Sequence, residues 1–409
     1  MKKIMEIALG IVTSVGGFLE IGSIATAAQA GADFSFQLIW AIVLGGLCII
    51  FLVEQAGRFS AVSGRTIPDA IRERFGFNYF AFLYFVLALV SLLVLAAEIG
   101  GVCIALELAT GIHFQWWTVP AAFLIWLVMW KGTFGVIEKG VSVLGLVTLS
   151  FVVGAYLIHP PEAQVLRGVW PSLPQHDKAH YWFAAVSILG ASISPYLFFF
   201  YSSGAIEDEW NEGYVGVNRI IATGGMTFGS VISISVLILA AMIFAPQGVK
   251  FEHYSQLPDL LVPVFGYWGY WLLVASIGIA CLGAALEITL EIAYFTAQGF
   301  GWNWSENQRP RDEARFAAAY TLTIIVAALI TITGIDPLTL TIFSMALTAA
   351  TLPVSIVPFL FLMNDYSYAR VYRNGWFSNA VVIAIISLAF VLAVVSIPLQ
   401  IFGGANESD

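Results

Sequence analysis

Two apolar segments of the chain contain small residues together with an acid or a proline. The first, residues 16–23, holds Glu20, and the second, residues 190–196, holds Pro195. Backbone that leaves a helix inside a bilayer is tolerated only where it is buried in protein or lines a cavity, and an acid at that depth usually faces a cavity. Glycines alone would also allow close helix packing. The acid and the matching proline favour a site that binds a substrate between the two segments.

Two further acids lie together in an apolar stretch. Glu287 and Glu291 are four residues apart, so a helix carries both on one face. They are candidates for a second cation site or a proton station. The alternative is an interior pair that is hydrogen-bonded to hydroxyls such as that of Thr289 or is held protonated by desolvation.

Three other acids occur in apolar runs and have simpler explanations. Glu54, Glu98 and Glu107 are expected to pair with Arg58 or with helix ends. Glu98 is also a candidate for a role in transport.

The composition indicates the class of the protein. Of the 409 residues, 59% are hydrophobic and 11% are charged, which is typical of a polytopic protein of the lipid bilayer. The core lacks a nucleophile–base pair and a metal cluster of catalytic spacing, and the three cysteines are scattered through apolar runs as packing residues. We expect a protein that is not an enzyme, has no cofactor and binds no nucleic acid.

A window of about 20 residues predicts eleven membrane-spanning helices. They cover residues 8–29, 37–59, 79–108, 115–131, 140–158, 181–204, 218–245, 268–298, 314–333, 338–363 and 377–402. The connections at 159–180 and 246–266 are expected to be external loops with short interfacial helices.

The positive charges predict the orientation. With the N-terminus inside, only Arg167, Lys178 and Lys250 of the 17 Lys and Arg residues lie outside. This asymmetry agrees with the positive-inside rule. We expect a cytoplasmic N-terminus and an extracytoplasmic C-terminus. The short chain, without targeting or glycosylation signals, fits a bacterial inner (plasma) membrane.

The two interrupted segments open the first and the sixth predicted span, which indicates an internal duplication. Five spans followed by five inverted spans is a common plan of transporters, with the substrate at the midplane between two broken helices. We expect one transporter domain over residues 1–409. One repeat would cover 8–158, the second 181–363, and an additional helix 377–402.

Several motifs of the chain match one family. Residues 20–32 read EIGSIATAAQAGA, the sixth span contains Gly190-Ala191 and Pro195, and the third contains Ala97-Glu98. This pattern resembles the NRAMP divalent-metal transporters, whose first helix has Asp-Pro-Gly-Asn, then Ala-Thr and Gln-Ala-Gly-Ala at the same spacing. The resemblance covers most of the chain. It implies an all-α LeuT-type fold and the carriage of a divalent cation across the membrane.

The resemblance also implies which residues bind the ion, and the chain departs from the family at the side-chain ligands. The aligned positions are Glu20, Ser23 and Ser194 through side chains, and Gly17 and Ala191 through backbone carbonyls. A glutamine of the family's tenth helix aligns with Met345. Tyr196 follows the motif proline, where its hydroxyl could bind a water of the hydrated ion. We expect Tyr196 and Met345 to line the substrate site.

The lost thioether ligand affects the choice of ion. Sulfur favours softer transition metals, whereas carboxylate, hydroxyl, carbonyl and water suit Mg²⁺, Ca²⁺ or Mn²⁺. A single carboxylate with two hydroxyls is too little to remove all water from Mg²⁺. The distant NRAMP-related magnesium transporters resemble the chain here, with a Gly-Ser pair followed by Thr-Ala-Ala-Gln. We expect partly hydrated Mg²⁺ or Mn²⁺ as the substrate.

Proton coupling is not expected. Two histidines of the family align with Tyr196 and Tyr201, and an acid of the third helix aligns with Leu95. Histidine exchanges protons near neutral pH, whereas an unperturbed tyrosine titrates near pH 10. We predict alternating access driven by the ion gradient and the membrane potential. Glu98, Glu287 and Glu291 are the candidates for a proton or second-cation route.

Two other functions stay open. The first is an organic-solute or small-cation transporter on the same scaffold, with Glu20 as counter-ion and Tyr196 stacking on the substrate. The second is a channel or receptor without a transport cycle, which explains the paired interruptions less well.

Overall fold

The computed structural model describes residues 20–131, 140, 143, 145–174, 176–306 and 308–403, and all regular elements among them are helical. The helices of the first half are α2 (Ile21–Phe34), α3 (Ile39–Ser63), α4 (Ile67–Phe75), α5 (Phe77–Thr110), α6 (Phe114–Trp130), α8 (Leu149–Leu157) and α9 (Glu162–Gly168). Those of the second half are α10 (Lys178–Ser192), α11 (Pro195–Glu207), α12 (Val215–Ile243), α13 (Val262–Phe265), α14 (Tyr267–Phe300), α15 (Ala314–Ile332), α16 (Pro337–Asn364), α17 (Tyr366–Ala369) and α18 (Trp376–Gly403).

Short 3₁₀ helices join several of these elements. They are η1 (Ser35–Leu38), η2 (Gly145–Thr148), η3 (Glu212–Tyr214), η4 (Ala245–Gln247), η5 (Tyr254–Leu260) and η6 (Arg370–Tyr372). Short helices lie in both long connections: α9 lies in one, and η5 and α13 lie in the other.

Eight helical stretches of the described chain are long and apolar enough to cross a membrane. They include the predicted third, seventh, eighth, ninth and tenth spans as α5, α12, α14, α15 and α16. The predicted fourth span is the shorter apolar helix α6. The predicted first span lies partly outside the described residues, and its described part continues to Phe34 instead of ending at residue 29.

Both half-helices that flank the second interruption are observed. Helix α10 ends at Ser192, Ile193 and Ser194 are not helical, and α11 begins at Pro195. At the first interruption, α2 begins directly after Glu20, whose backbone is extended with φ −112° and ψ 166°. Proline suits the first helical position because it has no N–H to leave unpaired.

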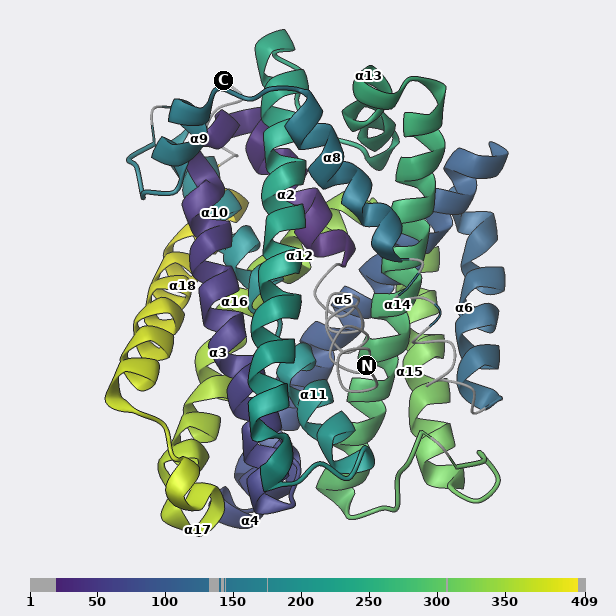
Figure 1. Ribbon diagram of the computed structural model, residues 1–409. Coiled ribbons are helices and arrows are strands. Elements are labelled where there is room, and N and C mark those ends of the chain that lie inside the picture. Colours follow the sequence, from purple (N-terminus) through teal and green to yellow (C-terminus); the bar gives the residue numbers. More distant parts are fainter. Residues whose placement is uncertain are drawn as a thin grey trace.

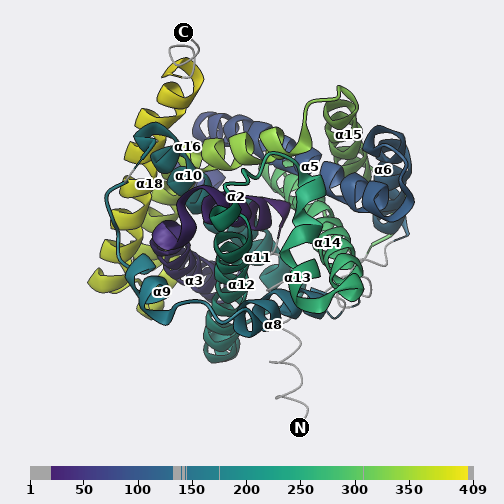
Figure 2. The same cartoon turned by 90° about the horizontal axis from the view of Figure 1, so that it is seen from above.

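The broken helices occupy the middle of the bundle (Figures 1 and 2). Helix α2 packs against α12, α10 and α16, and α11 packs against α3 and α14. Helices α6 and α15 lie at one edge of the bundle, and α18 lies at the opposite edge.

Helices α5 and α14 form a long antiparallel pair beside the broken helices. The Tyr270 hydroxyl donates to the Leu108 carbonyl at 2.6 Å near one end of the pair. Near the other end, the hydroxyls of Tyr84 and Thr296 lie 3.0 Å apart. Both helices contact α2, and α14 also packs against α11.

The structural partners predicted for two acids are confirmed. Glu54 binds Arg58 through two contacts of 3.0 Å, both within α3. Arg58 also donates to Asn374 at 3.0 Å, which ties α3 to the segment before α18. Glu107 accepts the Phe114 N–H at 2.7 Å and so satisfies the start of α6.

Candidate functional site

The two breaks meet through the residues that precede α2 and α11. Glu20 and Ser194 are the N-cap residues of these helices, a position from which a short polar side chain such as serine or aspartate usually accepts an amide of its own helix. Neither side chain does so. Instead, the Ser194 hydroxyl donates to Glu20 Oε1 at 2.9 Å. The side chains of the two breaks therefore point toward each other.

The Glu20 carboxylate is buried, with 1% of its surface exposed. Its Oε2 has no hydrogen-bond partner among the described residues, whereas Tyr196 adjoins the carboxylate. A buried polar oxygen without a partner costs about 1–3 kcal/mol and is rare in folded proteins. Glu20 Oε2 is thus available as a ligand at the meeting point of the breaks.

The other predicted ligands surround this point to different degrees. The Ala191 carbonyl accepts the Ser194 hydroxyl at 3.3 Å, so it lies beside the Glu20–Ser194 contact. The Ser23 hydroxyl donates to the Glu20 carbonyl at 2.8 Å within the first turn of α2. Gly17 lies outside the described residues.

Met345 of α16 contacts both breaks. A methyl group built on Gly22 would lie 2.7 Å from Met345 Sδ, and one built on Gly190 would lie 1.8 Å from the Met345 carbonyl oxygen. Gly190 is therefore needed for the close approach of α16, whereas at Gly22 the end of the Met345 side chain could move aside. Met345 is fully buried.

Two of the three candidate route acids lie near Glu20. Glu98 of α5 accepts the Ile21 N–H at 3.0 Å, so it reaches the first residue of α2. Glu287 of α14 interacts electrostatically with Tyr196, as Glu20 and Glu98 do. All three acids are buried. The structure therefore brings Glu20, Glu98 and Glu287 to one region of the bundle interior.

Glu291 differs from the other route candidates, because its hydroxyl partner is Ser91 of α5. The hydroxyl partner suggested by the sequence, Thr289, is wrong. Its hydroxyl donates to the Ala285 carbonyl at 2.6 Å inside α14. A threonine hydroxyl within a helix readily donates to the carbonyl four residues earlier. An acid on the same helix therefore takes its hydroxyl partner from a neighbouring helix.

Two contacts near the broken helices were not predicted. The thiol of Cys281, expected to be a packing residue, interacts with Glu98. At the far ends of α2 and α10, His180 Nε2 lies 2.8 Å from Asp33 Oδ2. Nothing in the spacing of these residues could have revealed the contacts, since each joins helices that are distant in the chain.

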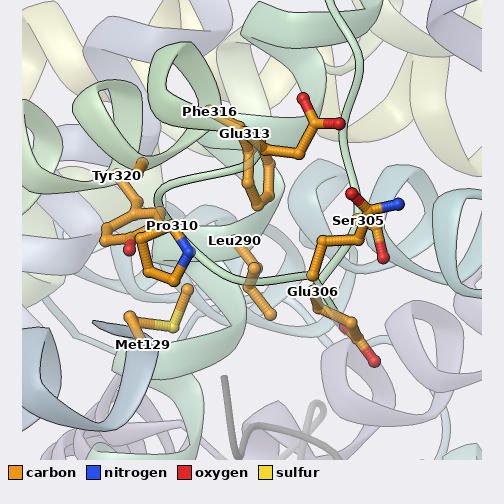
Figure 3. A pocket seen from close by; sticks show the side chains of 10 residues that line it. Met129, Leu290, Ser305, Glu306, Pro310, Glu313, Phe316 and Tyr320 are labelled. Atoms are coloured by element: carbon orange, nitrogen blue, oxygen red, sulfur yellow. The ribbon is translucent and has the colours of Figure 1, made fainter. Parts of the chain in front are cut away.

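A separate small cavity lies at the start of α15 (Figure 3). It is lined by residues of α6, α14, α15 and the segment between the last two, including Met129, Leu290, Glu306 and Tyr320. Tyr320 is buried, and its hydroxyl has no hydrogen-bond partner among the described residues. No predicted site residue lines this cavity, so it is distinct from the Glu20 region.

The described residues hold no group of three or more His, Cys, Asp or Glu side chains that could bind a metal together. A cation at Glu20 would therefore rely on one carboxylate with hydroxyl, carbonyl and water oxygens. Such a donor set suits weakly held, hard cations.

Solved structures with the same architecture are transporters. A structure of the Eremococcus coleocola manganese transporter, in complex with an aromatic bis-isothiourea substituted compound, matches 98% of this chain and 88% of its own, with a TM-score of 0.76 and 21% identity. Mhp1, a nucleobase-cation-symport-1 family transporter in a closed conformation with bromovinylhydantoin bound, matches 96% of this chain and 90% of its own, with a TM-score of 0.64 and 18% identity. The fold is therefore the all-α LeuT type.

Sequence comparison identifies the family. The divalent metal cation transporter MntH of Deinococcus radiodurans is 25% identical over 91% of this chain and 85% of its own length. The family described as natural resistance-associated macrophage protein-like (Nramp) matches residues 10–398. Because this match covers nearly the whole sequence, the chain belongs to the Nramp family, whose members are multi-pass membrane transporters and not enzymes.

Proposed function

We propose that this protein carries a divalent metal cation, partly hydrated Mg²⁺ or Mn²⁺, across the membrane by alternating access. The observation that carries the proposal is the buried Glu20 carboxylate, which lies between the two helix breaks with Oε2 unpaired among the described residues. Named relatives support the substrate class, since they include a divalent metal cation transporter and a manganese transporter.

The proposed ligands are hard oxygen donors. Glu20 supplies the charge, Ser23 and Ser194 supply hydroxyl oxygens, and the carbonyls of Gly17 and Ala191 complete the protein ligands. Ala191 lies in the last turn of α10, where carbonyls without helical partners form the negative end of the helix dipole. Waters would fill the remaining positions, with Tyr196 placed to bind one of them.

Uptake into proteoliposomes tests the proposal, with Mg²⁺, Mn²⁺ and Ca²⁺ measured in parallel. We expect saturable uptake of Mg²⁺ and Mn²⁺ by the unaltered protein. Glu20→Gln keeps the size of the side chain and removes its charge, so KM should rise about tenfold or more, since a contact with a charged group is worth about 1.5–3 kcal/mol. Glu107→Gln is the matched control, because Glu107 lies at a helix end and not at the breaks.

Absence of metal uptake by folded protein would contradict the proposal. A screen of organic cations would then examine the alternative, an organic-solute transporter on this scaffold. Competition between an organic cation and Mn²⁺ for one site would also support the organic-solute alternative.

We also propose that transport is not coupled to protons. The five histidines lie in loops or at helix ends, among them His176 and His180 beside Asp33. None adjoins Glu20 among the described contacts. A pH-sensitive dye inside proteoliposomes should therefore show no metal-dependent acidification. Acidification that follows metal entry would contradict the proposal, and Glu98, Glu287 and Glu291 would then be the candidates for the proton route.

We further propose the repeat boundaries and the cellular setting. The repeats cover 8–158 and 181–363, and the helix at 377–402 is an addition to them. The protein lies in a bacterial inner membrane with a cytoplasmic N-terminus and an extracytoplasmic C-terminus.

A further inference from the structure

The start of α2 is capped by a residue from another helix. The first amides of any helix lack partners within the helix, and an N-cap side chain usually accepts one of them. Glu20 is the N-cap residue of α2 and makes no such bond. Glu98 of α5, 77 residues away in sequence, accepts the Ile21 N–H at 3.0 Å instead. The Gly22 N–H interacts with the same carboxylate.

We propose that Glu98 is a positioning residue, which caps α2 in place of Glu20 and so leaves the Glu20 carboxylate free for the cation. The proposal that Glu20 receives a cation rests on the proposed function. The capping itself does not.

Competition for the Glu20 carboxylate is the physical basis of this role. A buried amide without an acceptor costs about 1–3 kcal/mol, and the Glu20 carboxylate is next to these amides in the chain. Without Glu98, Glu20 would gain by turning from Ser194 toward the amides of its own helix. The contact between Ser194 and Glu20 Oε1 at 2.9 Å would then be lost.

Electrostatics adds to the effect. The positive end of the α2 dipole lies at Ile21, next to the residue that is proposed to bind a cation. The Glu98 side-chain oxygen accepts an amide at this end, so it offsets the partial charge as an acceptor, whether or not the group is charged. Glu98 itself is held on α5 and contacts Cys281 of α14, so its position is set by helices other than α2.

Two conservative variants separate capping from other roles of Glu98. Glu98→Gln keeps the length and an acceptor oxygen but removes the charge. Glu98→Asp keeps the charge but is shorter by one methylene, so it does not reach the Ile21 amide. Capping requires a side chain long enough to reach the Ile21 amide. A proton relay or a direct ion ligand requires a carboxyl group that can carry a charge.

Metal uptake and amide hydrogen exchange measure the outcome. We expect Glu98→Gln to keep the KM for Mn²⁺ within about threefold of the unaltered protein, and Glu98→Asp to raise it about tenfold with little change in maximal rate. Without metal, exchange in the peptide that contains Ile21 and Gly22 should be faster in Glu98→Asp and unchanged in Glu98→Gln. The exchange result reports on the cap even if the protein carries no metal, so the two proposals fail separately.

Glu107→Asp is the matched control, since Glu107 caps the start of α6 from the same helix α5 but at its exposed end. It should alter exchange near Phe114 and leave the KM unchanged. A Glu98→Gln variant that loses cation binding as Glu98→Asp does would overturn the proposal, as would unchanged α2 exchange in Glu98→Asp. If Glu98→Asp does not fold, the KM of Glu98→Gln tests the proposal, and a KM raised about tenfold would overturn it.

Discussion

At the scale of single residues, two N-cap side chains turn away from their own helices. Glu20 and Ser194 meet across the two breaks at 2.9 Å, while the start of α2 is satisfied by Glu98. When an N-cap side chain accepts no amide of its own helix, the unpaired amides cost free energy unless another group accepts them. Such an exchange of partners is a sign that these side chains are held for binding.

The Ser194 hydroxyl gives a prediction at this scale. Ser194→Ala removes a hydrogen bond to a carboxylate and one proposed oxygen ligand. We expect the KM for Mn²⁺ to rise about tenfold or more, which corresponds to about 1.5–3 kcal/mol for a hydrogen bond to a charged group. Uptake kinetics in proteoliposomes measure the change.

Ser187→Ala is the control for this variant. Ser187 lies on α10 and is buried like Ser194, but its hydroxyl donates to the Ile342 carbonyl at 3.3 Å. Its removal should leave the KM unaltered. Equal effects of the two substitutions would show that loss of helix packing, and not loss of a ligand, weakens transport.

At the scale of helices, α16 holds the two broken helices together at glycines. Met345 lies against Gly22 through its side chain and against Gly190 through its backbone carbonyl. The end of a methionine side chain is flexible and can move aside, whereas a backbone carbonyl within a helix cannot. The contact of α16 with α10 at Gly190 therefore tolerates a larger side chain less well than the contact of α16 with α2 at Gly22.

Alanine substitutions test this difference in tolerance. Gly190→Ala would place a methyl group 1.8 Å from the Met345 carbonyl oxygen, so we expect a large loss of thermal stability in detergent or no folded protein. Gly22→Ala should cost less, because only side-chain atoms of Met345 lie in the way.

Gly204→Ala in α11 is the matched control, since nothing lies within 4 Å of the added group. It should be neutral or stabilise the protein by about 0.5–1 kcal/mol, because alanine favours a helix more than glycine does. A Gly190→Ala protein that is as stable as Gly204→Ala would refute the close packing of α10 on α16.

At the scale of the whole molecule, positive charges gather at one end. The helix α4, with Arg72 and Arg74 in its last turn, lies at the same end as α17 and Arg370. The connections that contain α9 and α13 lie at the opposite end (Figure 1). The positive-inside rule predicts that the α4 end is cytoplasmic.

Cysteine labelling tests this orientation. The three native cysteines are buried and should react little, so Leu173→Cys and Val371→Cys each introduce one accessible thiol. Leu173 follows α9 and Val371 follows α17, and they are 83% and 80% exposed. We expect a membrane-impermeant maleimide to label Leu173→Cys in intact cells, and Val371→Cys only after the cells are opened. The reverse pattern would invert the orientation.

Much of the fold could be predicted from the sequence, because a bilayer imposes long apolar helices and makes each departure from them visible. The limits of α5, α14 and α16 lie within two residues of the predicted spans. Glu54 and Arg58 could be paired because they are neighbours on one helix face. Glu20 could be singled out for the same reason, since it interrupts an apolar run, and the substrate site there stays a prediction.

The sequence alone thus determined the class of protein, the positions of the two breaks and the residues beside them. Only the tertiary structure decided what those residues contact: Ser194 with Glu20, Glu98 with Ile21, and Met345 with both Gly22 and Gly190. Hydropathy and local spacing report on a single helix. Each of these contacts joins helices that are far apart in the chain, so it depends on how the helices pack. The sequence pattern of one helix does not indicate which helix lies beside it.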